Sequence, residues 1–155
     1  MSFWDWITSL FLRQNPSVKT AIEEQNIVPK LKEEEIKAPE TLEEVAQSLV
    51  IFTPSGVLTE YRTVKNIRDW VNQHMVYKRY RRPRLIEDIW NEKTGDCTDY
   101  SRLIEEMALS VGIRGIHRAH GYSSGEKHDW LIYEGNIIDG TGTHANYEYV
   151  GEGFW

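Results

Sequence analysis

Residues 94–100 read TGDCTDY and contain Cys97, the only cysteine in a chain of 155 residues. Apolar residues recur from Tyr100 to Val111 at spacings of three and four, which predicts one buried face of a helix, and Gly112 supplies a stop. Cys97 then lies in the first turn, where unpaired N–H groups and the helix dipole favour a negatively charged sulfur. This stretch predicts a nucleophilic thiol, with a buried and inert cysteine as the alternative.

A thiolate nucleophile needs a base and a group that orients the base. His128 opens a predicted strand that ends at Tyr133, and a strand ending at Asp139 returns after a turn around Gly135. Side chains alternate along a strand, so a loop of two or four residues puts His128 and Asp139 on one face. A four-residue loop from Tyr133 to Asn136 makes them diagonal neighbours, about 5.5–8 Å apart at Cβ. A tight Gly135-Asn136 turn would separate them by about 13 Å. We predict the longer loop.

Five short motifs follow one another along the chain: GDCTDY (95–100), VGIR (111–114), GY (121–122), HDW (128–130) and ID (138–139). Their order is more specific than any one of them alone. Together they resemble the transglutaminase-like family of papain-related thiol enzymes, over roughly residues 60–142. The resemblance implies an α+β fold with a papain-like core, in which a helix headed by cysteine packs on an antiparallel sheet bearing His and Asp.

The resemblance also implies roles for individual residues. Cys97 is the expected nucleophile, His128 the general base and Asp139 the residue that orients it, with an acyl-thioester intermediate. Three further residues are candidates for the oxyanion site or the groove: Trp90, Asp96 and Trp130. For Trp90, packing in the core is the alternative. This chain has Asp129 where the family usually has a small residue, and its His-to-Asp spacing is shorter than usual.

The predicted reaction is thiol-dependent cleavage or transfer at an amide or isopeptide bond of a protein or peptide substrate. Resolution of the thioester by water gives a peptidase or amidase, and resolution by an amine gives a protein-glutamine acyltransferase. Hydrolysis is favoured because a small domain with one short groove has little to exclude water. Two alternatives stay open: a cell-wall peptidase of another Cys-His type, and a catalytically silent binding module recruited by its N-terminal arm.

Composition predicts one compact domain, since 40% of the residues are hydrophobic and 12% aromatic. We expect this domain at residues 41–155, where Thr41 and Glu44 form a capping-box pattern before the first predicted helix. Residues 16–40 are expected to form an acidic linker or loosely attached arm. Most of the formal net charge of −6 comes from residues 23–44, where eight acidic residues stand against three lysines, so acidity gives no reason to expect cationic partners.

Residues 1–15 are expected to form an apolar, aromatic arm. A helix would place five residues on one face: Phe3, Trp4, Ile7, Leu10 and Phe11. The arm lacks a positive n-region and a cleavage site, so we expect a soluble, cytoplasmic or otherwise non-secreted protein. Docking on a partner protein or on the domain itself is the main expectation for the arm, and peripheral contact with a membrane surface is the alternative.

Residues 78–84 carry five cations around one aromatic, directly before a helix expected at 85–91. We expect a solvated loop that could lie along the groove and select anionic substrate groups, and we do not expect nucleic-acid binding. No cofactor is expected, because no phosphate-cradling loop or dinucleotide fingerprint is present. No metal is expected either: His117 and His120 would face opposite sides of a strand, and Cys97 with His128 or His144 lacks a ligand-pair spacing.

Overall fold

The structure is a computed structural model that describes residues 40–142 and 144–155. The predicted arm at 1–15 and all but the last residue of the acidic segment at 16–40 lie outside the described residues, so these remain predictions. The described helices are α3 (Leu42–Ser48), α4 (Glu60–His74), α5 (Ile86–Glu92) and α6 (Cys97–Ser110). The described strands are β1 (Val76–Tyr77), β2 (Thr94–Gly95), β3 (His117–Ser123), β4 (Glu126–Tyr133), β5 (Asn136–Ile138) and β6 (Tyr147–Glu152).

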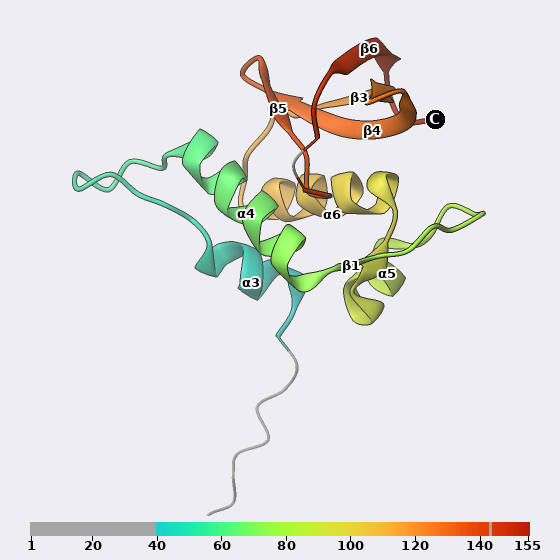
Figure 1. Ribbon diagram of the computed structural model, residues 1–155. Coiled ribbons are helices and arrows are strands. Elements are labelled where there is room, and N and C mark those ends of the chain that lie inside the picture. The colour runs from blue at the N-terminus through green and yellow to red at the C-terminus, as the bar shows by residue number, and fades with distance from the viewer. Residues whose placement is uncertain (1–39, 143) are drawn as a thin grey trace, which may run out of the picture. The chain divides into compact units, whose positions relative to one another are not determined.

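Helix α6 is the central element of the fold. Figure 1 shows it against the four-stranded sheet, with α3, α4 and α5 packed around it. The face predicted from the apolar spacing is buried at Tyr100, Leu103, Ile104, Met107 and Ala108. Along the described part of the chain, no helix combines the length and apolarity needed to cross a lipid bilayer.

The predicted ends of two helices are confirmed. Helix α3 has the capping box of Thr41 and Glu44, in which each side chain accepts the other residue's backbone N–H. Helix α6 begins at Cys97 after a second capping box, formed by Asp96 and Asp99. Gly112 follows this helix with a φ of +86°, a backbone angle that glycine adopts without steric cost.

The sheet has the strand order β5-β4-β3-β6, and all its neighbouring strands are antiparallel. The predicted four-residue loop between β4 and β5 is wrong, because the loop contains only Glu134 and Gly135. Both have positive φ, 49° and 75°, which suits the right-handed twist of a tight hairpin. Tyr133 and Asn136, the first and last residues of the predicted loop, pair with each other as the end of the β4–β5 ladder. This additional pair leaves the register of the two strands unchanged. His128 and Asp139 therefore lie on one face, as the register argument required.

A short parallel ladder lies at the head of α6. Strand β1 pairs with β2 at Val76–Thr94 and Tyr77–Gly95. Lys78 N–H donates to the Gly95 carbonyl at 2.8 Å and extends the ladder by one bond. The loop that follows β1 is thereby held beside the residues that lead into Cys97.

The pairing of β3 with β6 is irregular between His120 and Gly121. A Cβ added to Gly121 would lie 1.9 Å from the Glu148 carbonyl oxygen on β6 and 2.9 Å from Cη2 of Trp130. Only glycine allows β6 to approach this closely. The approach matters for the site because β6 carries Tyr147, described below.

Candidate active site

Cys97 lies at the first position of α6, directly after β2, and is partly exposed. It lines a cavity of about 460 Å³, which we call the Cys97 cavity. The first turn of the helix offers backbone N–H groups to this cavity. The thiol is therefore both accessible and placed where negative charge is favoured.

His128, on β4, and Asp139, directly after β5, form a buried pair. The Nε2 atom of His128 lies 2.6 Å from Oδ2 of Asp139, and both residues are buried. Cys97 is close enough to raise the pKa of His128, and Nδ1 is the ring nitrogen that Asp139 does not engage. Burial lowers the pKa of His128, but the hydrogen bonds and charges of Asp139 and Cys97 outweigh burial and raise the pKa to about 9. At neutral pH the ring is an imidazolium held between a carboxylate and a thiol.

Asp139 is fixed by more partners than His128 alone. Its Oδ1 accepts the backbone N–H of Thr141 at 2.9 Å and the hydroxyl of Thr141 at 2.7 Å. Its Oδ2 also accepts the hydroxyl of Tyr147, on β6, at 2.8 Å. Burial raises the pKa of Asp139, but the hydrogen bond and charge of His128, followed by the Thr141 donors, lower it overall. The carboxylate is ionised and held in one orientation.

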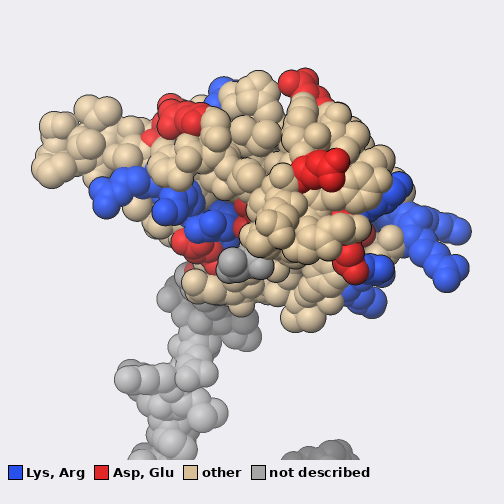
Figure 2. Space-filling view, turned by 45° about the horizontal axis from the view of Figure 1, so that its top comes forward, with Lys and Arg blue, Asp and Glu red and all other residues tan. Residues whose placement is uncertain are grey.

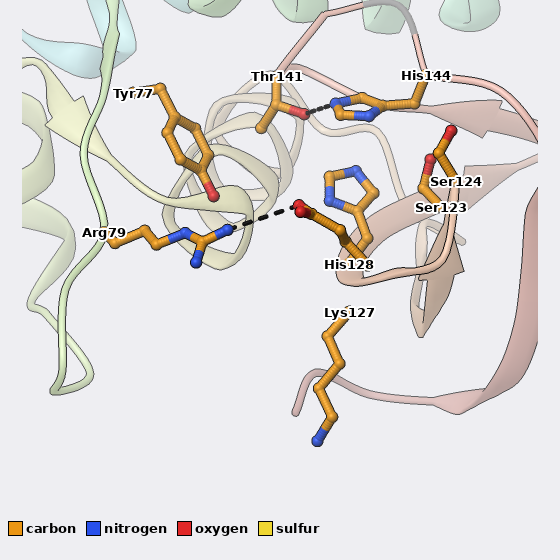
Figure 3. Close-up of a pocket in the computed structure, with 9 residues that line it drawn as sticks. Tyr77, Arg79, Ser123, Ser124, Lys127, His128, Thr141 and His144 are labelled. Atoms are coloured by element: carbon orange, nitrogen blue, oxygen red, sulfur yellow. Dashed lines mark hydrogen bonds and ion pairs between the residues drawn. The ribbon is translucent and has the colours of Figure 1, made fainter.

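His144 completes a cluster with these residues. Its ring centroid lies 4.4 Å from that of His128, and its Nε2 lies 2.9 Å from the Thr141 hydroxyl. His128, Asp139 and His144 offer ligand atoms within 4.8 Å of one another, a spacing that a metal ion could use. A metal there would have to replace the His128–Asp139 and Thr141–His144 hydrogen bonds. Figure 3 shows both imidazole rings facing a second cavity, of about 450 Å³, which we call the His128 cavity.

Asp129, the residue that differs from the family pattern, links β4 to the first turns of α6. Its side chain is 1% exposed and accepts the hydroxyl of Thr98, the neighbour of Cys97. It also accepts the backbone N–H of Trp155 at 3.3 Å, while the Ser101 hydroxyl donates to its carbonyl at 3.4 Å. Burial raises the pKa of the Asp129 carboxyl. The extra carboxylate therefore has a structural use beside the nucleophile.

The three candidates for the oxyanion site or groove lie in different places. Asp96 lines the Cys97 cavity while capping α6. Trp130 is 1% exposed and lies behind His128, with ring centroids 6.0 Å apart. Trp90 instead stacks on Trp70 at 5.5 Å, beneath the Lys93 ammonium, in a cavity on α5 that shares no lining residue with the Cys97 cavity. The packing alternative thus describes Trp90, because the α5 face that carries it turns toward α4 and not toward Cys97.

Tyr77 lines both cavities and was not among the residues that the sequence singled out. Its pairing with Gly95 places it two residues from the nucleophile across the β1–β2 ladder. Burial and the nearby Cys97 raise the pKa of Tyr77, while the neighbouring Arg79 lowers it less. Figure 3 shows its hydroxyl pointing into the cavity. No sequence spacing marks this residue, since the contact depends on a two-residue strand.

The His128–Asp139 pair predicts a pH dependence of stability. A histidine with a pKa of about 9 in the folded chain and 6.5 unfolded stabilises the fold fully below pH 6.5, and this contribution is lost as pH rises through 9. We expect the free energy of unfolding in urea to fall by about 1–3 kcal/mol more in the wild type than in His128→Gln between pH 6.5 and 9. The Asp139 carboxylate stays ionised across this window, because its pKa is lowered. Parallel pH profiles for the two proteins would contradict the ion pair.

Comparisons with known proteins identify the family of this chain. A family model described as the transglutaminase-like superfamily matches residues 48–155. A crystal structure from Cytophaga hutchinsonii, named a putative cysteine protease, is similar with 21% sequence identity and a TM-score of 0.49. The similarity covers 64% of this chain and 36% of that one, so the chain spans about a third of that structure's length. A search of curated proteins gives no match.

Proposed function

The chain belongs to the transglutaminase-like superfamily, and on that premise we propose that it is a thiol hydrolase acting on an amide or isopeptide bond. Membership supports a papain-like cysteine enzyme in general terms. The observation that carries the finer proposal is the buried hydrogen bond between His128 Nε2 and Asp139 Oδ2, with Cys97 near enough to raise the pKa of His128. Nucleophile, base and orienting group are the parts that acyl transfer through a thiol requires.

In the proposed mechanism the Cys97 thiolate attacks the carbonyl carbon, a C–S bond forms, and the carbonyl electron pair moves to oxygen. As this intermediate collapses, the C–N bond breaks and the His128 imidazolium gives its proton to the leaving amine. Neutral His128 then takes a proton from water as the water attacks the thioester. Collapse of the second intermediate releases the carboxylic acid and restores the thiolate–imidazolium pair.

Two groups are proposed to stabilise the oxyanion. The Cys97 backbone N–H lies at the start of α6, where the helix dipole favours negative charge. The Tyr77 hydroxyl lies on the other wall of the cavity, next to Arg79, which can polarise it. Tyr77 thus takes the role for which the sequence suggested Trp90.

The test is the reaction with 4-nitrophenyl acetate, an activated ester that needs no substrate recognition. We expect a burst of one 4-nitrophenolate per protein and one acetyl group on Cys97 in the intact mass, and neither in Cys97→Ala. Decay of the acetyl-enzyme in plain buffer supports hydrolysis, whereas persistence until an amine is added supports transfer. A wild type without a burst, or a burst that survives in Cys97→Ala, contradicts the proposal.

Tyr77→Phe is the matched variant for the oxyanion role. Removing one donor is expected to slow acetylation about 10- to 100-fold, because the tetrahedral intermediate loses one hydrogen bond. Alkylation of Cys97 by iodoacetamide forms no oxyanion and should keep its rate. Equal loss in both reactions would show that Tyr77 only supports the thiol.

A further inference from the structure

The loop between β1 and α5 separates its cations into a buried one and exposed ones. The side chain of Arg84 is 8% exposed and bonds Glu92 at 2.6 Å, with Asp99 at 3.6 Å. Its guanidinium also lies over the Tyr80 ring, 4.0 Å from the centroid. Arg84 therefore holds the loop in place, and its charge is already neutralised.

The exposed cations of this loop have few hydrogen-bond or ion-pair partners among the described residues. Arg81 and Arg82 are exposed, and neither side chain has a hydrogen-bond or ion-pair partner within residues 40–142 and 144–155. Arg79 has one partner, Glu126, at a separation of 3.6 Å between two side chains that are both more than three-quarters exposed. An exposed ion pair of this kind contributes little stabilising free energy in water. These charges are available to a ligand.

The exposed cations lie along one groove. The Cys97 cavity shares the lining residues Tyr77, Arg79, Glu126 and Lys127 with the His128 cavity. It shares Tyr80, Asp96, Thr98 and Trp155 with a third cavity, of about 390 Å³, lined by Arg81 and Arg82. The groove thus runs from His128 past Cys97 to a cationic end at Arg81 and Arg82. Figure 2 shows separate groups of Lys and Arg side chains at the edges of one face of the molecule.

The carboxylates in this groove are turned toward the protein. Asp96 accepts the backbone N–H groups of Asp99 and Tyr80. Asp99 faces Arg84, and Asp129 is buried against Thr98. Of the lining carboxylates, Glu126 alone is exposed. The charge that a bound chain would meet is therefore predominantly positive at the Arg81–Arg82 end.

We propose that the groove takes an acidic peptide segment, with carboxylate side chains on one side of the reacting bond seated against Arg81 and Arg82. This inference rests on the proposed function for the position of the bond, but not for the binding itself. Lys127 adds a further cation, held over the Trp155 ring with Nζ 4.1 Å from its centroid. Trp155 lies between the two cavities and offers an apolar wall for the peptide backbone.

Binding is measured on the full chain carrying Cys97→Ala, so that nothing is turned over. The probes are two fluorescein-labelled peptides of equal length, one with four Glu residues and one with four Gln residues at the same positions. By anisotropy in low salt, we expect the Glu peptide to bind at least about 5-fold more tightly, and added salt to remove the preference. Arg81→Gln with Arg82→Gln should abolish the preference, while Glu126→Gln should increase it.

The matched control removes two exposed cations elsewhere. Arg62→Gln with Lys65→Gln changes the net charge equally on α4, and neither residue lines the groove. Equal affinity for both peptides, or equal losses in the two double variants, would overturn the inference. Tighter binding of a single-stranded oligonucleotide than of the Glu peptide would overturn it in favour of a nucleic acid. A Glu preference in a chain whose Cys97 gives no acetyl burst would keep the acidic site and reject the hydrolase.

Discussion

Replacing His128 with alanine is expected to slow the reaction of Cys97 with iodoacetamide about 100-fold at pH 6. A free thiol has a pKa near 8.5, so less than about one per cent of it is thiolate at this pH. In the folded chain the ring of His128, with a pKa of about 9, is an imidazolium beside the sulfur and favours the thiolate. The wild type should therefore react faster than the variant at pH 6, and the difference between them should shrink as pH approaches 8.5.

Mass spectrometry of the intact protein measures alkylation of Cys97 without ambiguity, because Cys97 is the only cysteine in the sequence. His117→Ala is the matched control, since His117 is exposed at the start of β3 and lines neither the Cys97 nor the His128 cavity. Asp139→Asn should give an intermediate loss, because the ring remains but its orientation and charge weaken. Identical pH profiles for the wild type and His128→Ala would identify an inert thiol and favour the silent binding module.

Gly121→Ala is expected to lower the free energy of unfolding by about 3 kcal/mol or more. The new methyl group would lie 1.9 Å from the Glu148 carbonyl, and backbone on both strands would have to move to make room. Because β6 also carries Tyr147, the variant should lose fast alkylation of Cys97 along with stability. Urea unfolding with a fitted m-value measures the first effect.

Gly125→Ala separates this steric cost from the general cost of replacing a glycine. Gly125 has a φ of +84° and open space around its Cα, so alanine there incurs only the conformational strain of about 1 kcal/mol. Equal losses in the two variants would contradict the clash at β6. A stable Gly121→Ala protein with fast alkylation would show that Tyr147 is not needed to fix Asp139.

Local signals explain why much of the fold was predictable. Asp96 and Asp99 cap α6 through contacts three residues apart, and the α6 stripe needs only helical periodicity. The register that brings His128 to Asp139 also follows from one hairpin. Even the wrong loop length did not disturb it, because shortening a loop by one residue on each side conserves the pairing.

The residues that the sequence missed depend on contacts between distant segments. Tyr77 reaches the Cys97 cavity through a parallel ladder of two pairs, and Tyr147 reaches Asp139 from a separate strand. Neither contact has a spacing rule, since both are set by packing. The sequence left Trp90 between the groove and core packing, because its aromatic character is visible in the sequence but the face of α5 that turns toward Trp70 is not.

The hydrogen bond from Tyr147 ties the Asp139 carboxylate to an edge strand of the sheet, because β6 pairs with β3 alone among the described strands. An edge strand can separate from a sheet while the other strands stay paired. If β6 separates from β3, Asp139 loses the Tyr147 donor but keeps His128 and the two donors of Thr141. Local opening of this edge would therefore loosen the carboxylate without unfolding the rest of the sheet.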